Sequence, residues 1–237
     1  MSMIRRIPMD GVMNFRDLGG FACPGGVTRW NRIYRSAALT DATPEDVERL
    51  RRRNIRLVLD LRYPHEAQAR PDVAIPGVQN LNFPLLGDFP MDKLPINGEV
   101  KSTRTLYRMY RLVLRHGGEA ILGAFRALLA CDGAVLFHCA AGKDRTGIFA
   151  MLLQALAGVE WADILADYTV SELYLEGRTT DISGSNVHNM RMLRAFLEKE
   201  YGSAEKYLLG LGASKKELDA FRSLFVCPER DNEQGGW

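Results

Sequence analysis

The segment from His138 to Gly147, His-Cys-Ala-Ala-Gly-Lys-Asp-Arg-Thr-Gly, constrains this chain more than any other feature. It follows an apolar run, 134–137, that is typical of a buried strand, and it precedes another, 148–156, that is typical of a buried helix. A tight loop between a strand and a helix leaves backbone N–H groups unpaired at the positive end of the helix dipole. The segment is therefore expected to form an anion-binding loop.

Cys139 and Arg145 determine the expected chemistry of this loop. A thiolate is stabilised at a helix N-terminus and is a strong nucleophile. The planar guanidinium of Arg145 fits two phosphate oxygens at once. The small residues Ala140, Ala141 and Gly142 allow the backbone to approach an anion closely. We therefore expect the loop to bind a phosphoryl group and the Cys139 thiolate to attack its phosphorus, which forms a phosphocysteine.

Two further side chains of the loop are expected to act on the bound anion. Lys143 places a positive charge at the mouth of the loop, which suits an anion with more than one phosphate. The Thr146 hydroxyl can reach back to the thiolate and help it leave in the second step, and it can also cap the helix.

The loop resembles the signature of the cysteine-dependent phosphatases, the protein tyrosine phosphatase superfamily. Its Gly-Lys-Asp-Arg-Thr-Gly form is similar to that of the bacterial branch, the atypical tyrosine and phosphoinositide phosphatases. Other segments resemble further motifs of this branch, namely 14–20, 34–36, 60–62 followed by Glu66, and 201–208. The resemblance implies one phosphatase domain over residues 1–237, with the catalytic loop at 138–147 and a helical C-terminal part at 146–225. It implies hydrolysis of phosphotyrosine in proteins, with phosphoserine, phosphothreonine or phosphoinositides as further substrates.

The resemblance also assigns roles to two neighbours of the nucleophile. It implies that His138 holds the shape of the loop. It makes Asp144 a candidate general acid, because a nearby phosphate dianion favours the protonated form of a carboxyl group. The alternative for Asp144 is an ion pair with a neighbouring arginine.

Two other acidic residues compete for the role of proton donor. Asp60 lies at the end of a buried strand, where open α/β sheets place their sites, and its alternatives are a pair with Arg62 or the cap of a loop. Asp88 has the chain position of the movable acid loop of ordinary tyrosine phosphatases, although the Trp-Pro-Asp of that loop is absent. The sequence leaves the choice among the three carboxylates open.

Alternating strand and helix patterns followed by helices favour an α/β fold, with a mostly parallel central sheet flanked by helices. Residues 12–35 have the pattern of short strands and turns, and Thr43 and Pro44 are typical of a helix start. The remaining expected elements are strands in 55–61 and 78–85, helices over 101–116 and 119–130, and helices from Thr146 onward with breaks near Gly158, 177–186, Gly202 and Gly212.

The composition limits the binding partners and the cellular compartment that we expect for this protein. The formal net charge of +2 argues against wholesale binding of nucleic acid. The four cysteines lack metal-ligand spacing, and the expected chemistry requires no metal or other cofactor. No apolar stretch is long enough to span a bilayer, and a nucleophilic Cys139 must stay reduced, so we expect a cytoplasmic protein.

A row of basic residues suggests a second surface. The five residues are spaced by three or four positions and share one helical face, here called the basic row: Lys101, Arg104, Arg108, Arg111 and Arg115. An ordinary solvated helix face explains this pattern, and so does weak contact with an anionic surface.

Two other functional classes use a similar loop. A catalytically silent phosphate-binding module would keep the anion site without turnover, but Cys139, Arg145 and several acids are all present. A rhodanese-like sulfurtransferase also has a cysteine in an anion loop, but Arg145 followed by Thr146 and Gly147 fits phosphatases better. The sequence therefore favours a phosphatase.

Overall fold

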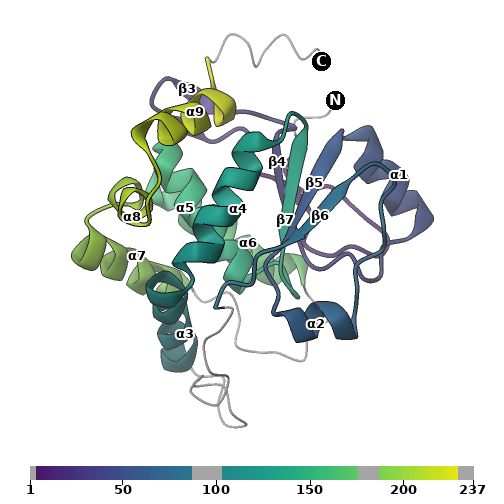
Figure 1. Ribbon diagram of the computed structural model, residues 1–237, viewed down its shortest axis with the longest axis horizontal. Helices are drawn as coiled ribbons and strands as arrows, with labels where there is room; N and C mark the ends of the chain where they lie inside the picture. The colour runs from purple at the N-terminus through teal and green to yellow at the C-terminus, as the bar shows by residue number, and fades with distance from the viewer. Residues whose placement is uncertain (1–3, 87–102, 176–186, 229–237) are drawn as a thin grey trace.

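The computed structural model describes residues 4–86, 103–175 and 187–228. Its central sheet has the strand order β1-β4-β7-β5-β6 (Figure 1). The strands are β1 (Arg16–Asp17), β4 (Ile33–Ser36), β5 (Ile55–Asp60), β6 (Gln79–Asn82) and β7 (Ala134–His138). Strands β4, β7, β5 and β6 are parallel, and β1 is antiparallel at one edge. The expected α/β fold with a mostly parallel sheet is confirmed.

The helices cover both faces of this sheet. They are α1 (Pro44–Arg52), α2 (Pro64–Ala69), α3 (Thr103–His116), α4 (Gly118–Ala130), α5 (Asp144–Ala157), α6 (Trp161–Tyr174), α7 (Val187–Tyr201), α8 (Ala204–Gly210) and α9 (Lys215–Phe225). Helix α1 starts as expected, with Thr43 in a capping box with Asp46. Helix α2 was not predicted. Within the described residues, no helix is long and apolar enough to cross a membrane.

The helical C-terminal region is confirmed, and a short strand that was not expected follows it in a second, antiparallel sheet. This sheet joins β2 (Ala22–Cys23), β3 (Gly26–Thr28) and β8 (Val226–Cys227). Strand β8 follows α9 directly and pairs with β3. Pro228 keeps helix α9 from continuing through Cys227, because a residue before proline is disfavoured in the helical region.

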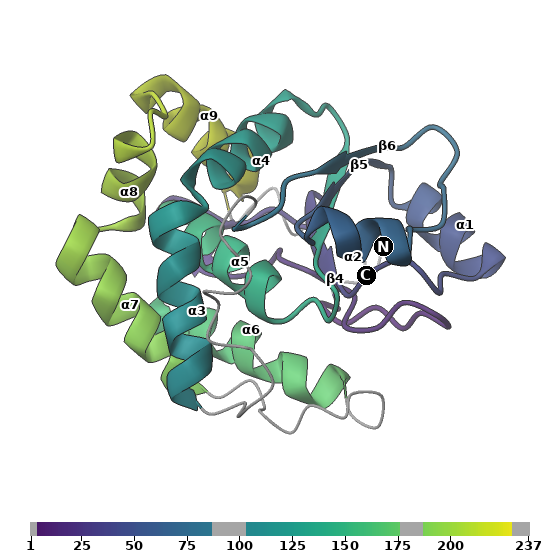
Figure 2. The same ribbon diagram turned by 60° about the horizontal axis from the view of Figure 1, so that its bottom comes forward.

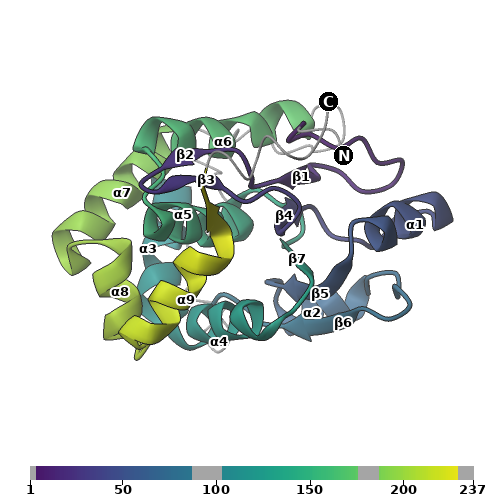
Figure 3. The same cartoon turned by 90° about the horizontal axis from the view of Figure 1, so that it is seen from above.

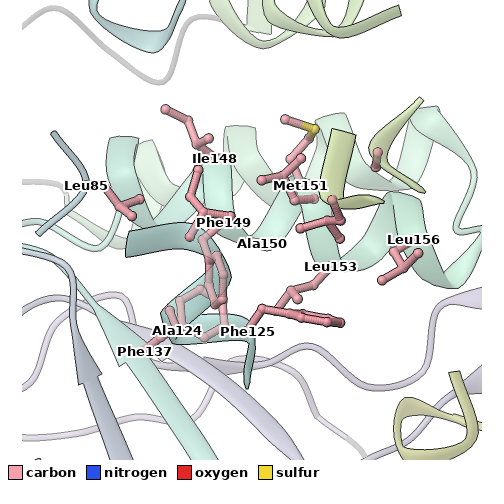
Figure 4. Close-up of a cluster of buried hydrophobic side chains, with 14 of the residues drawn as sticks. Leu85, Ala124, Phe125, Phe137, Ile148, Phe149, Ala150, Met151, Leu153 and Leu156 are labelled. Atoms are coloured by element: carbon pink, nitrogen blue, oxygen red, sulfur yellow. The ribbon is translucent and has the colours of Figure 1, made fainter. Parts of the chain in front are cut away.

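Successive side chains of a strand point to opposite faces of the sheet, so the core has two layers. In β7, Val135 and Phe137 belong to the larger cluster, whereas Ala134 and Leu136 belong to the smaller one. Seen from above, the sheet separates α1 from α4 and α5 (Figure 3). Helix α5 is the centre of the larger layer, since 11 of its 14 residues are buried. Its apolar side chains pack against α4 and β7 (Figure 4).

The strand register places the site. Ser36 of β4, Asp60 of β5 and Asn82 of β6 lie on one line with His138 of β7, at the carboxyl ends of the four parallel strands. The loop that follows His138 and the N-terminus of α5 therefore lie at the edge of the sheet where such folds bind ligands.

Candidate active site

The loop between β7 and α5 turns sharply at Gly142. This residue has φ +66°, and a Cβ atom there would lie 2.1 Å from the carbonyl oxygen of Ser36. Only glycine fits, because any side chain would both strain the backbone and collide with β4. The turn brings the loop back against the end of the sheet before α5 begins at Asp144.

Residues that surround the loop bind its carbonyl oxygens from outside the loop. The carbonyl oxygen of Ala140 accepts from the N–H of Ala38 at 3.1 Å. Asn14 Nδ2 donates to the carbonyl oxygens of Ala141 (3.1 Å) and Gly142 (3.0 Å). The carbonyl oxygen of Gly142 also accepts from Arg35 Nη2 at 2.9 Å. In a trans peptide the N–H points away from the carbonyl of the same unit. The N–H groups that follow these carbonyls therefore point into the loop, where they can bind an anion.

A buried cluster of three charged side chains supports the loop from behind. Asp167 of α6 accepts from Arg16 Nε at 2.8 Å and from Arg35 Nη1 at 2.6 Å, and these side chains are 1–2% exposed. Burial raises the pKa of Asp167, but the two guanidinium groups outweigh burial and hold it below its ordinary value. Burial, and then the charge of Arg16, lowers the pKa of Arg35 to about 10. The cluster has one more positive than negative charge, which favours an anion in the loop.

The predicted nucleophile, Cys139, is the first residue of the loop. Cys139 is 2% exposed and lies in the larger core layer at the end of β7. Thr146, in the first turn of α5, is fully buried, and its hydroxyl oxygen has no hydrogen-bond partner within the described part of the chain. That hydroxyl is therefore available to a thiolate. Lys143 immediately precedes α5 and is 6% exposed.

Arg145 is held by Glu66, the third residue of α2. Its Nη2 donates to Oε1 of Glu66 at 2.9 Å, its Nη1 donates to Oε2, and its Cζ lies 5.0 Å from the ring centre of Tyr63. Burial lowers the pKa of Arg145, but hydrogen bonds to Glu66 and the charge of Cys139 outweigh burial and raise it. A guanidinium has five N–H donors, so Nε–H and the remaining Nη–H bonds are left for phosphate.

His138 has contacts at both ring nitrogens. Its Nδ1 lies 3.2 Å from the carbonyl oxygen of Cys139, and its Nε2 lies 2.9 Å from Oδ2 of Asp72. The ring is fully buried. These contacts connect the peptide of Cys139 to the buried Asp72.

Asp60 lies beside this histidine in a buried pair with Arg62. Both of its carboxylate oxygens accept hydrogen bonds from Arg62, at 2.7–3.0 Å. This is the pairing that the sequence offered as the alternative to a catalytic role. With both oxygens engaged, Asp60 is badly placed to protonate a leaving group. Asp88, the third candidate, lies outside the described residues.

The same corner contains a possible set of metal ligands. One ligand atom each from Asp60, Asp72 and His138 lies within 4.8 Å of the others. Arg62 Nη2 already contacts Asp60 at 2.7 Å and Asp72 at 3.0 Å. The guanidinium therefore supplies the cation that balances both carboxylates, and a metal ion would have to displace it.

Asp144 is the half-buried first residue of α5. Its Oδ1 accepts a hydrogen bond from the hydroxyl of Tyr110 on α3, and that hydroxyl lies 2.7 Å from the hydroxyl of Tyr168 on α6. Figure 2 shows α3, α5 and α6 next to one another. The sequence offered an ion pair with a neighbouring arginine as the alternative role of Asp144, but Arg145 pairs with Glu66.

Comparison with known proteins shows the family of this chain. Residues 7–227 match the family model of the tyrosine phosphatase family. The chain belongs to this family. It is 30% identical over 225 residues to a tyrosine-protein phosphatase of Nostoc commune, which covers 85% of this chain and 76% of that protein. It is 36% identical over 174 residues to a putative tyrosine-protein phosphatase of Cupriavidus necator, with 70% and 62% covered.

Two more distant proteins were also found. The triple specificity protein phosphatase PtpB of Mycobacterium tuberculosis is 27% identical over 278 residues, with 94% of this chain and 99% of that protein covered. A crystal structure of a Pseudomonas aeruginosa TpbA variant in complex with pTyr is 16% identical, with 83% and 96% covered and a TM-score of 0.38. Membership of the tyrosine phosphatase family makes this chain a phosphoric monoester hydrolase.

Sequence reasoning missed several residues that support the phosphatase site. Glu66 and the arginines Arg16 and Arg35 lie in segments that resemble the branch, but no role was assigned to them. Asp72, Tyr110, Asp167 and Tyr168 were not singled out. A signal existed for Asp167, which shares the buried face of α6 with Ile164, Tyr168 and Ser171. A charged side chain on a buried helix face needs a buried partner.

The basic row is not a uniformly free surface. Arg111 and Arg115 lie with Cζ 4.7 Å and 5.0 Å from the ring centre of Phe196 on α7, and Arg115 is 3.7 Å from Glu200. Arg108 is exposed. Lys101 and the side chain of Arg104 lie outside the described part. The C-terminal end of the row thus packs against α7.

Proposed function

We propose that this protein hydrolyses phosphotyrosine in proteins through a phosphocysteine on Cys139. One observation carries the mechanism: the loop carbonyls are bonded to the scaffold, which leaves the N–H groups of the loop for phosphate, between Cys139 and an Arg145 oriented by Glu66. Such preorganised donors stabilise charge that develops in the transition state.

The first step transfers the phosphoryl group. The thiolate of Cys139 forms a bond to phosphorus while the bond from phosphorus to the ester oxygen breaks, and Arg145 and the loop N–H groups hold the equatorial oxygens. Asp144 gives its proton to the departing oxygen and becomes a carboxylate. Since Tyr110 occupies Oδ1 of Asp144 and Arg62 occupies both oxygens of Asp60, Asp144 is the better proton donor.

The second step regenerates the enzyme. Water attacks the phosphocysteine and gives one proton to the Asp144 carboxylate, and the sulfur leaves as a thiolate. The buried Thr146 hydroxyl donates a hydrogen bond to that thiolate as its charge develops. Phosphate then leaves a site ready for the next ester.

We also propose that the substrate range is broader than phosphotyrosine. Lys143 adds a positive charge beside the loop, which favours substrates with several phosphates, such as phosphoinositides. Phosphoserine and phosphothreonine are included in line with the name of the triple specificity relative. The exposed Arg108, with Lys101 and Arg104, adds weak attraction to an anionic surface. A single domain over residues 1–237 and a reducing, cytoplasmic location complete the proposal, since Cys139 acts only when reduced.

The Cys139→Ser variant tests covalent catalysis. It should release no measurable phosphate from p-nitrophenyl phosphate, because a hydroxyl is a far poorer nucleophile at this position. It should still bind tungstate, since the loop N–H groups and Arg145 are unchanged. Turnover within about tenfold of wild type, a loss of only ~1.4 kcal/mol, would refute the nucleophile. Thiocyanate formation from thiosulfate and cyanide by the wild type would instead indicate a sulfurtransferase.

Asp144→Asn tests the proton donor. A general acid matters most when the leaving oxygen is strongly basic. The variant should lose far more activity on phenyl phosphate than on p-nitrophenyl phosphate, whose leaving group needs little help. Equal losses on both esters would mean that Asp144 shapes the loop without donating a proton.

A further inference from the structure

We infer that Tyr110 and Tyr168 are positioning residues for Asp144, an inference that rests on the proposed role of Asp144 as the general acid. The two tyrosines come from different helices, α3 and α6, and both are buried. The Tyr110 hydroxyl donates to Oδ1 of Asp144 and lies 2.7 Å from the Tyr168 hydroxyl. The three side chains thus form a hydrogen-bonded chain from the interior to the first turn of α5.

The direction of this chain follows from counting protons. An ionised carboxylate only accepts hydrogen bonds, so Tyr110 gives its one proton to Asp144. Tyr168 must then donate to the oxygen of Tyr110. Both phenols retain these protons near neutral pH, because burial, and next the charge of Asp144, raises the pKa of Tyr110 and Tyr168.

This direction determines which oxygen of Asp144 carries the catalytic proton. While Oδ1 accepts from Tyr110, the proton of the neutral acid resides on Oδ2. A proton on Oδ1 would face the Tyr110 donor, unless both tyrosine hydroxyls reversed their direction. A general acid must hold its proton within hydrogen-bond reach of the leaving oxygen. Tyr110 therefore keeps the carboxyl group in one orientation, with Oδ2 as the donor.

Removing the Tyr110 hydroxyl should weaken proton donation by Asp144, because the carboxyl group loses the hydrogen bond that fixes its orientation.

Tyr110→Phe isolates this contribution. The substitution retains the ring, which meets the ring of Tyr168 edge-on with centres 6.4 Å apart, and removes only the hydroxyl. Tyr207→Phe is a matched control, since Tyr207 is also buried and its hydroxyl donates to the carbonyl of Leu114 on α3 at 2.8 Å. Tyr168→Phe leaves the hydrogen bond between Tyr110 and Asp144 in place and tests the tyrosine that is farther from Asp144 along the hydrogen-bonded chain.

The readout is the ratio of kcat for phenyl phosphate to kcat for p-nitrophenyl phosphate. Tyr110→Phe should lower kcat on phenyl phosphate about tenfold, a part of the ~100- to 10,000-fold typical of general acid–base catalysis. Its loss on p-nitrophenyl phosphate should be much smaller. Tyr168→Phe should show a smaller effect of the same kind. Tyr207→Phe should leave the ratio of the two esters unchanged.

A second comparison separates this inference from the proposed function. If Asp144→Asn is selective for the poorer leaving group and Tyr110→Phe is not, the inference is overturned while Asp144 remains the acid. If Asp144→Asn affects both esters equally, the assignment of Asp144 is overturned together with the inference. Adding Tyr110→Phe to Asp144→Asn should cost no further activity on phenyl phosphate, and a further tenfold loss would show that Tyr110 does not act through Asp144.

Discussion

Arg35 donates from Nη2 to the carbonyl oxygen of Gly142 at 2.9 Å and so joins the central sheet to the sharpest turn of the catalytic loop. The Nη1 of the same guanidinium pairs with Asp167, which also pairs with Arg16. The loop proposed to bind phosphate is therefore held by an arginine that pairs with Asp167, a buried carboxylate of α6. We expect the geometry of this loop and the folding stability to depend together on Asp167.

Asp167→Asn should strongly destabilise the protein. The substitution leaves two buried guanidinium groups without their counter-charge, and breaking a buried pair from one side costs about 3–5 kcal/mol. Asp41→Asn is the control, because Asp41 pairs with Arg70 at 2.9 Å on the surface, with both side chains about two-thirds exposed, and such pairs contribute about 0–1 kcal/mol. Urea unfolding measures both losses. A similar free energy of unfolding for the two variants would contradict the role of the buried cluster.

The pH dependence of stability should carry the signature of the same residue. Arg16 and Arg35 outweigh burial and hold the pKa of Asp167 below its ordinary value of 3.8. A carboxyl group with a lower pKa in the folded than in the unfolded chain stabilises the fold above the unfolded value. That contribution is lost as pH falls through the folded pKa. The difference in unfolding free energy between wild type and Asp167→Asn should be constant above about pH 5 and should shrink below about pH 4. A constant difference across this range would refute the assignment.

The proposed anion site could be predicted from local sequence for a physical reason. Cys139, Gly142 and Arg145 lie within one short loop, so their spacing along the chain is enough to suggest it. The groups that orient them come from distant elements: Glu66 from α2, Tyr110 from α3 and Asp167 from α6. Spacing along the chain contains no information about such contacts, which depend on the packing of helices.

The same limit explains the other differences. Asp60 was placed correctly at the carboxyl edge of the sheet, but its pairing with Arg62 depends on a side-chain geometry that the sequence left open. The strand 226–227 was missed because it is too short to give a local pattern and its partner, β3, lies about two hundred residues earlier in the chain. Arg104, Arg108, Arg111 and Arg115 of the basic row lie on the expected helix, α3. The contact of Arg111 with Phe196 could not be anticipated from the spacing of the row.

Glu66→Gln should weaken the phosphate clamp. An amide replaces one of the two oxygens that accept from Arg145, so the guanidinium loses part of its orientation. Hydrogen bonds between charged groups contribute about 1.5–3 kcal/mol, so kcat/KM should fall about ten- to a hundredfold. Steady-state kinetics with p-nitrophenyl phosphate measures this change. Higher activity in the variant would show that Glu66 competes with phosphate for Arg145.

Oxidation should report on the reactive thiolate. Hydrogen peroxide should inactivate the enzyme, bound phosphate should protect it, and added thiol should restore at least part of the activity. Cys23→Ser is the control, since the pKa of Cys23 is raised by burial and, next, by Cys227, which disfavours its thiolate. This variant should be inactivated at the wild-type rate. Equal inactivation with and without saturating phosphate would mean that the sensitive group lies outside the anion site.

The basic row should affect substrate choice through its outer end. Arg104→Glu combined with Arg108→Glu reverses two charges while sparing Arg111 and Arg115, which pack on Phe196. Attraction to an anionic surface is screened over ~8 Å at physiological ionic strength. The variant should therefore lose activity on phosphoinositide in anionic vesicles, mainly through KM and mainly at low salt, and retain it on p-nitrophenyl phosphate. Lys215→Glu with Lys216→Glu reverses two exposed charges on α9, at the other end of the molecule from α3 (Figure 1), and should change neither activity. If both double variants act on vesicles like the wild type across a salt series, the outer end of the row is an ordinary solvated helix face.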